Sequence, residues 1–168
     1  MEVIQSFLVD HTNLKSGIYV SRKDDKFTTL DLRFTCPNQE PAMQPAAIHT
    51  IEHLVATFLR NHPGWKDSVV YLGPMGCLTG FYLILSESIT PEEIKPLIVE
   101  SMKFVENFEG IVPGTTPATC GNYLLHDLPM AKWEAKRYKE RLITDFHSGY
   151  YMLNRPVIVR GNLEFHDA

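Results

Sequence analysis

The stretch of sequence that decides the fold and the site is Ala46-Ala47-Ile48-His49-Thr50-Ile51-Glu52-His53-Leu54-Val55-Ala56. Its larger apolar residues recur at spacings of three and four, and this spacing continues to Phe58 and Leu59. Such a period puts them on one face of an amphipathic helix, which we predict over residues 46–61. The helix is expected to end at Asn61-His62-Pro63-Gly64, because proline and glycine terminate helical periodicity.

Polar residues interrupt this apolar helix in the order H-x-x-E-H, at His49, Glu52 and His53. Residues four apart on a helix share one face, with Cβ atoms about 5–6 Å apart, so both imidazoles can bind one divalent metal. The Glu52 carboxylate can then reach the open coordination position and act as acid or base. The alternative is two surface histidines that happen to lie one turn apart, but buried polar groups on an apolar helix need a partner. We therefore predict half of a metal-dependent active site.

A catalytic metal centre commonly has three protein ligands and one open position. Cys120 is the best candidate for the third ligand, because it follows a loop rich in Gly, Pro and Thr and precedes Gly121-Asn122. Taken alone, Cys120 is explained better as a buried thiol. Three histidines are rival ligands, namely His126, His11 and His62, although His62 is most simply the C-terminal cap of the first helix.

A second cysteine, Cys77, lies in the glycine-rich turn Gly73-Pro74-Met75-Gly76-Cys77. Such glycines allow close approach of the backbone to a ligand, and a thiol there can serve as nucleophile or as general acid and base. The competing interpretation is a small apolar residue in a core strand. Cys36 is expected to be structural, and an odd number of widely spaced cysteines makes disulfides unexpected.

The remaining segments predict an α+β fold. Strands are expected at residues 17–23, 26–35, 68–72 and 78–86, and further helices at residues 91–108 and 128–146. Thr90 and Asp127 are positioned to cap those two helices. The tail at residues 156–165 is expected to be a short strand or an extended arm. We predict one domain over residues 1–168, a two-layer sandwich of a mainly antiparallel sheet with helices on one face.

Composition excludes several classes of protein. The 168 residues carry a net charge of −4 with histidine neutral, and no basic run marks a nucleic-acid binder. The first residues lack the basic and apolar regions of a signal peptide, and no apolar stretch approaches the roughly 18 residues of a membrane span. We therefore expect a cytoplasmic protein that binds neither nucleic acid nor membrane.

Three separated motifs together resemble the LuxS family, the S-ribosylhomocysteine lyases. They are His49-Thr50-Ile51-Glu52-His53, the Gly73–Cys77 turn followed by Thr79-Gly80-Phe81-Tyr82, and Cys120-Gly121-Asn122-Tyr123 with His126-Asp127-Leu128. Asp31-Leu32-Arg33-Phe34, and Ser6 with Asp10-His11-Thr12, are also similar to the N-terminal region of that family. Agreement of several motifs, in order and approximate spacing, over nearly the whole chain is more specific than any one of them.

The resemblance implies a metal site and its chemistry. His49, His53 and Cys120 would bind one divalent metal per subunit, Fe²⁺ in the native state, with Zn²⁺ or Co²⁺ able to replace it. The substrate would be S-ribosylhomocysteine, and the products homocysteine and 4,5-dihydroxy-2,3-pentanedione, the precursor of autoinducer-2. Cys77 and Glu52 would move protons in the isomerisation and elimination steps.

The resemblance also implies a homodimer with active sites at the subunit interface. Three residues would contact substrate or assist catalysis, namely Arg33, Ser6 and His11. The sequence departs from the commonest family pattern at four positions that bear on polarity and substrate contacts, namely Tyr71, Cys36, Leu78 and Thr119. Two other interpretations remain open from the motifs, an H-x-x-E-H metallopeptidase and a non-catalytic metal-binding protein of the same fold.

Overall fold

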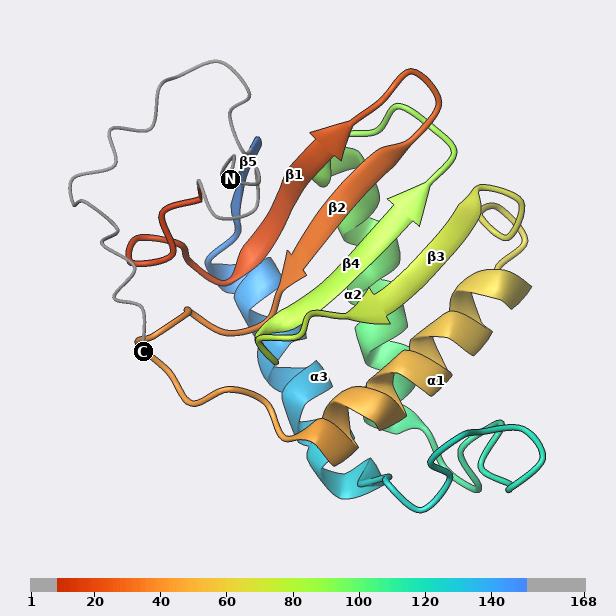
Figure 1. The fold of residues 1–168 in the computed structure, drawn as a ribbon. Coiled ribbons are helices and arrows are strands. Elements are labelled where there is room, and N and C mark those ends of the chain that lie inside the picture. Colours follow the sequence, from red (N-terminus) through yellow and green to blue (C-terminus); the bar gives the residue numbers. More distant parts are fainter. Residues whose placement is uncertain (1–8, 151–168) are drawn as a thin grey trace, which may run out of the picture.

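A computed structural model describes residues 9–150, and these form the predicted α+β arrangement (Figure 1). The elements along the chain are β1 (Gly17–Lys23), β2 (Thr28–Arg33), α1 (Pro45–Asn61), β3 (Val69–Pro74), β4 (Gly80–Leu85), α2 (Pro91–Asn107), α3 (Leu128–Thr144) and β5 (His147–Tyr150). Ser6 and the tail at residues 156–165 lie outside the described residues. The expectation of one domain over residues 1–168 also extends past them and stays a prediction.

The strands form one five-stranded sheet in the order β3-β4-β2-β1-β5. Neighbours are antiparallel except β5, which pairs in parallel with β1. The sequence did not predict β5, because His147-Ser148-Gly149-Tyr150 shows no apolar alternation and its pairing partner lies far away in the chain. Gly17 makes the pairing possible, since a Cβ atom at this position would lie 2.1 Å from the carbonyl oxygen of His147.

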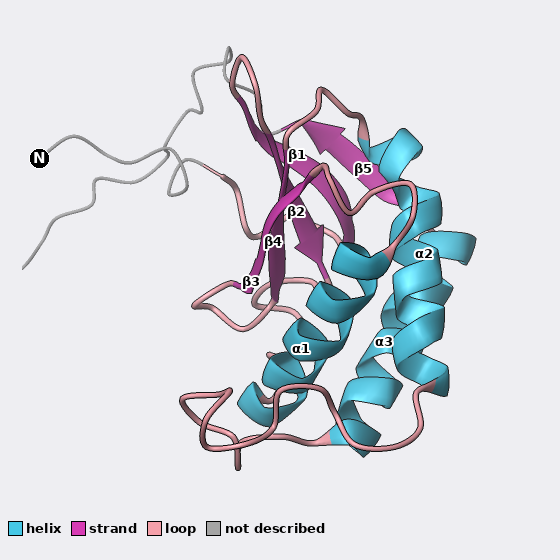
Figure 2. Cartoon of the chain, turned by 90° about the vertical axis from the view of Figure 1, so that its right-hand side faces the viewer, coloured by secondary structure: helices cyan, strands magenta, loops and turns pink. Residues whose placement is uncertain are grey.

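All three helices cover one face of the sheet, as Figure 2 shows edge-on. The apolar face of α1 is buried against the sheet and the other helices through residues that include Ile48, Ile51, Leu54, Val55 and Leu59. Those side chains are at most 3% exposed, whereas Glu52 and His53 on the other side of α1 are only half-buried. Packing of the apolar face therefore turns the polar residues of the motif toward the surface of the helical layer.

Helix α3 begins where Asp127 caps it, with the Asp127 carboxylate accepting a hydrogen bond of 2.9 Å from the backbone N–H of Met130. The backbone N–H of Asp127 donates to Thr50 Oγ1 of α1 at 3.0 Å. Thr90 and Glu93 form the capping box of α2, and Pro96 is accommodated inside that helix. The contact between Asp127 and Thr50 fixes the residue before α3 against the middle of α1. Within residues 9–150, no helix is long and apolar enough to cross a membrane.

Candidate metal centre and neighbouring thiol

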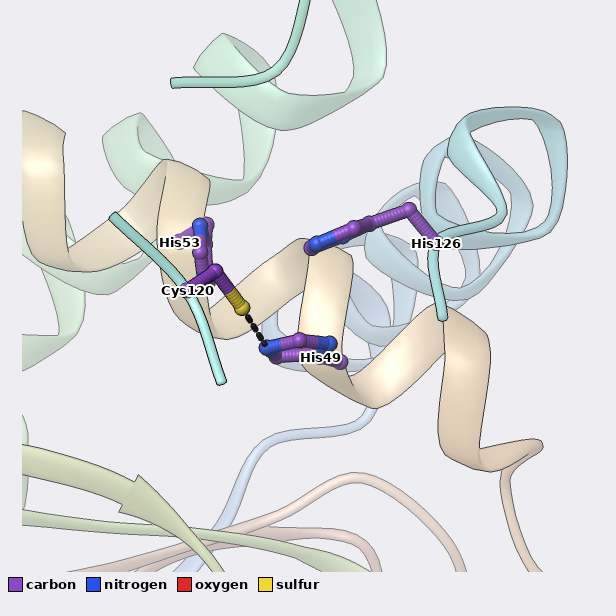
Figure 3. Close-up of side chains that lie close together, drawn as sticks. All are labelled: His49, His53, Cys120 and His126. Carbon is purple, nitrogen blue, oxygen red and sulfur yellow. Dashed lines mark hydrogen bonds between the residues drawn. The ribbon is translucent and has the colours of Figure 1, made fainter. Parts of the chain in front are cut away.

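Four side chains that can ligate a metal meet beside the first half of α1 (Figure 3). They are His49 and His53 of α1, Cys120 of the long loop between α2 and α3, and His126 just before α3, and we call them the metal cluster. One ligand atom from each lies within 4.8 Å of all the others. The structure thus brings together the three predicted ligands and one of their three rivals.

Backbone carbonyls orient both histidines of α1. His49 Nδ1 lies 2.8 Å from the carbonyl oxygen of Leu125, and His53 Nδ1 lies 2.7 Å from that of Pro113. A carbonyl oxygen only accepts, so each Nδ1 carries the proton and each Nε2 keeps a free lone pair. This is the arrangement in which metal-binding histidines are usually held.

The spacing and chemistry of the donors fit a transition metal. His49 Nε2 lies 3.4 Å from Cys120 Sγ. Bond lengths near 2.0–2.1 Å for nitrogen and 2.3 Å for sulfur separate tetrahedral ligands by about 3.3–3.6 Å. The remaining separations, up to 4.8 Å, need only small side-chain movements to match. Imidazole and thiolate ligands suit Zn²⁺ and Fe²⁺ and do not suit Mg²⁺ or Ca²⁺.

The loop that carries Cys120 is ordered by its own threonines. Thr119 Oγ1 donates to the carbonyl oxygen of Gly114 at 2.8 Å, and the N–H of Cys120 donates to the carbonyl oxygen of Thr116 at 3.0 Å. Gly114 has a φ of +76°, and a Cβ atom there would lie 3.2 Å from His53 Nδ1. Thr119, one of the departures from the common family pattern, therefore helps to hold the thiol ligand in place.

The other two rival histidines lie apart from the metal cluster. His62 is the C-cap residue of α1, as predicted, and its Nε2 lies 3.4 Å from a Glu100 carboxylate oxygen. His11 Nδ1 lies 2.8 Å from the carbonyl oxygen of Val9. Burial, and then the nearby charges of His49 and His53, hold the pKa of His126 below its ordinary value. A neutral His126 is the form that can bind a metal.

A second group of polar side chains surrounds Cys77 in the turn between β3 and β4, and we call Asp31, Arg33, Cys77 and Thr79 the thiol cluster. Cys77 is exposed, and its Sγ lies 3.0 Å from Thr79 Oγ1. Arg33 Nη1 donates to Thr79 Oγ1 at 2.5 Å and lies 3.8 Å from the Cys77 sulfur. A positive charge thus stands next to the thiol.

Asp31 holds that positive charge in place. Arg33 Nε lies 3.1 Å from Asp31 Oδ1, and Arg33 Nη2 pairs with Asp31 Oδ2. Asp31 is 0% and Arg33 is 2% exposed, so this ion pair is buried. The sequence interpretation placed Arg33 as a substrate contact, whereas its described contacts join it to Asp31, Thr79 and Cys77.

The two clusters are linked through the backbone. Leu78 follows Cys77 with a φ of +58°, and its carbonyl oxygen accepts a 2.9 Å hydrogen bond from the N–H of Met43, just before α1. In both views the β3–β4 turn lies near the first turns of α1 (Figures 1 and 2). Within residues 9–150, no hydrogen bond or ion pair engages the Glu52 carboxylate, and none joins His11 to either cluster. All three cysteines are free, as predicted.

Sequence reasoning did not assign roles to Thr50, Thr79 or Asp31. The signal for two of them is strand alternation, since residues two apart on a strand point to the same face. This rule places Asp31 beside Arg33, and the turn brings Thr79 back toward Cys77. For Thr50 no local signal exists, because its partners Asp127 and His126 lie 76–77 residues away.

The fold and these two clusters define a class, an α+β protein with a helix-borne H-x-x-E-H pair, a loop cysteine that completes a donor set for a metal, and a separate exposed thiol. Residues 4–148 match the model of the S-ribosylhomocysteinase (LuxS) family, so the chain belongs to this family. The match covers all the described positions of both clusters.

Curated relatives agree with the family match. An S-ribosylhomocysteine lyase of Phocaeicola vulgatus is 55% identical over 147 residues, covering 85% of this chain and 91% of the relative. Proteins with the same name are 52% identical in Porphyromonas gingivalis, over 85% of this chain and 92% of the relative, and 53% identical in Clostridium acetobutylicum, over 84% and 92%.

Proposed function

We propose that this protein is an S-ribosylhomocysteine lyase, a carbon–sulfur lyase that releases homocysteine and 4,5-dihydroxy-2,3-pentanedione. The observation that carries the proposal is the position of an exposed thiol, Cys77, near a donor set of two histidines and a cysteine, in a chain of the LuxS family. A peptidase has no need of this thiol, and a purely structural metal site needs neither Cys77 nor Glu52.

The proposed metal ligands are His49, His53 and Cys120, and the proposed metal is Fe²⁺, which Zn²⁺ or Co²⁺ can replace. When bound, the ion supplies a Lewis acid that polarises the oxygens of the sugar carbon chain. The carbonyl contacts of His49 and His53 support this assignment, because they leave both Nε2 lone pairs directed away from the backbone.

Cleavage of an unactivated thioether requires an acidic C–H next to the carbon that bears sulfur. Two isomerisation steps move the sugar carbonyl along the chain until such a C–H exists, and each step needs a proton removed from one carbon and a proton delivered elsewhere. We assign this proton movement to Cys77, with Glu52 assisting. The Arg33 guanidinium, 3.8 Å from the sulfur and held by Asp31, supports Cys77 as a proton acceptor and donor, because it faces any negative charge on the sulfur.

The last step is a β-elimination. Glu52 removes the proton next to the carbonyl, the electron pair forms a carbon–carbon double bond, and the carbon–sulfur bond breaks with its electrons leaving on sulfur. Protonation of that sulfur gives the homocysteine thiol. A half-buried carboxylate with no hydrogen bond or ion pair among the described residues is available for this transfer. Ser6, His11 and Arg33 remain proposed substrate-binding residues, and the contacts of Arg33 favour an action on Cys77.

We also propose a homodimer in the cytoplasm, with active sites at the subunit interface and one domain over residues 1–168. Large apolar side chains near both clusters support an interface there, since Leu124 is 78% exposed and Tyr71 is 49% exposed. A second subunit covering them would also shield Glu52 and Cys77 from water. Sedimentation of the purified protein tests this, and a monomer at working concentration would contradict it.

The activity assay uses catalytic amounts of the metal-loaded protein, S-ribosylhomocysteine and a thiol reagent. We expect one free thiol per substrate consumed. Cys36→Ala is the matched control among the three cysteines, because Cys36 belongs to neither cluster, and it should release thiol at the wild-type rate. No thiol release by fully metal-loaded protein would rule out the lyase.

A further inference from the structure

The fourth member of the metal cluster, His126, has a feature that the three-ligand assignment does not use. Its Nε2 atom is buried and has no hydrogen-bond partner among the described residues. Buried nitrogen atoms nearly always have a partner, so an isolated one indicates an ion or a solvent molecule beside it. The His126 ring lies 4.2 Å from the His49 ring and 4.8 Å from the His53 ring, centroid to centroid. In Figure 3 the ring extends toward the space that the other three donors surround.

Thr50 determines which nitrogen of His126 carries the proton. Thr50 Oγ1 donates its single proton to the carbonyl oxygen of Ala46 at 2.9 Å and accepts from the N–H of Asp127 at 3.0 Å. Its remaining interaction, 3.1 Å from His126 Nδ1, must therefore also be an accepting one. His126 Nδ1 carries the proton, and Nε2 keeps a free lone pair. All three histidines of the metal cluster are thus held in the same tautomer, with the same nitrogen left free.

Three imidazoles and one thiolate make a complete tetrahedral donor set, which is typical of closed sites. A lyase needs an open position for the substrate oxygens, so one donor must leave. His126 is held least firmly, because its Nδ1 donates to a hydroxyl at 3.1 Å, whereas His49 and His53 donate to carbonyls at 2.8 Å and 2.7 Å. It also lies outside α1, which carries the other two histidines.

We propose that His126 is the fourth donor of the metal cluster in the substrate-free protein and gives way when the substrate enters. The proposal rests on the proposed lyase function for its second half, since displacement requires the substrate. Its first half, four protein donors at rest, concerns the side chains alone.

X-ray absorption of the zinc-loaded protein tests the first half, because scattering within the imidazole ring allows bound histidines to be counted. We expect three imidazoles and one sulfur in the wild-type protein, and two imidazoles and one sulfur in His126→Ala. Three imidazoles in both proteins, or two in the wild type, would overturn the proposal. His126→Gln provides the same count if His126→Ala does not fold.

Zinc affinity of the Thr50 variants provides a second test that a structural role alone would not reproduce. Thr50→Ser keeps the hydroxyl that accepts from His126 and should bind zinc like the wild type. Thr50→Val removes it and should weaken zinc binding roughly 10–100-fold, the usual effect of losing the partner of a metal-binding histidine. Equal affinity in both variants would show that Thr50 does not prepare His126 as a donor.

Displacement is tested with Cys77→Ala, which is expected to bind S-ribosylhomocysteine without turning it over. The number of bound imidazoles should fall from three to two when this substrate is added. A constant three would overturn the displacement. If the substrate does not bind at all, the lyase function fails instead, while the count in the substrate-free protein still decides the role of His126.

Discussion

The metal cluster and the thiol cluster lie near each other but are built in different ways. The metal cluster joins α1 to a long loop, and its side chains are oriented by single hydrogen bonds to backbone carbonyls and one threonine. The thiol cluster is built on adjacent strands and depends on a buried ion pair between Asp31 and Arg33. Metal binding should therefore be separable from fold stability in the first region, whereas charge and stability are joined in the second.

The largest effect is expected from removing a proposed ligand. His53→Ala and Cys120→Ala should each abolish turnover and weaken metal binding by more than about 100-fold, because direct ligands contribute more than their supporting partners. Thermal unfolding of the metal-free proteins should change little. Elemental analysis after dialysis measures the loss. Full metal retention in Cys120→Ala would show that another side chain is the third ligand.

Cys77→Ala should separate the clusters most clearly. It should keep one metal per chain and lose roughly 10²–10⁴-fold in turnover, the range for a positioned acid–base group. Metal content and thiol release, measured on the same preparation, provide the comparison with Cys120→Ala. If Cys77→Ala lost its metal and Cys120→Ala kept it, the roles of the two thiols would be reversed.

The buried ion pair should make the thiol cluster sensitive in stability. Asp31→Asn removes the negative charge that faces Arg33 in a buried place, and we expect a loss of about 3–5 kcal/mol in the free energy of unfolding. Asp24→Asn is the matched control, because Asp24 pairs with Arg22 at the same spacing of two residues but at the surface. Its effect should stay below about 1 kcal/mol. Equal losses in urea denaturation would contradict the distinction.

Two glycines extend the comparison to smaller effects. Gly114→Ala places a side chain at a φ of +76° and 3.2 Å from His53 Nδ1. The strain, about 1–2 kcal/mol, and the displaced imidazole should weaken metal binding roughly tenfold. Gly76→Ala, beside Cys77, meets no atom within 4 Å and should leave metal affinity unchanged. Isothermal titration with Zn²⁺ compares them, and equal affinities would mean that the loop tolerates a side chain against His53.

Much of the fold could be predicted because its signals are local. The period of α1, the caps Thr90 and Asp127 and the alternation of β1 and β2 each lie within a few residues, and the structure confirms them. The last helix ends at Thr144, slightly before the predicted boundary, and β5 follows it. That strand was missed because four residues paired in parallel at a sheet edge leave almost no pattern in the sequence.

The sequence by itself determined that His49 and His53 share one face of a helix with Glu52 beside them, because one helical turn fixes that geometry. It also placed Cys77 in an open glycine turn. Only the tertiary structure decided which distant donors join the helix, since Cys120 and His126 reach α1 across contacts 71 and 76 residues apart. The same holds for Arg33, whose contacts with Thr79 and Cys77 exist only because β2 pairs with β4. Contacts of this kind come from the packing of whole elements, and no local spacing encodes them.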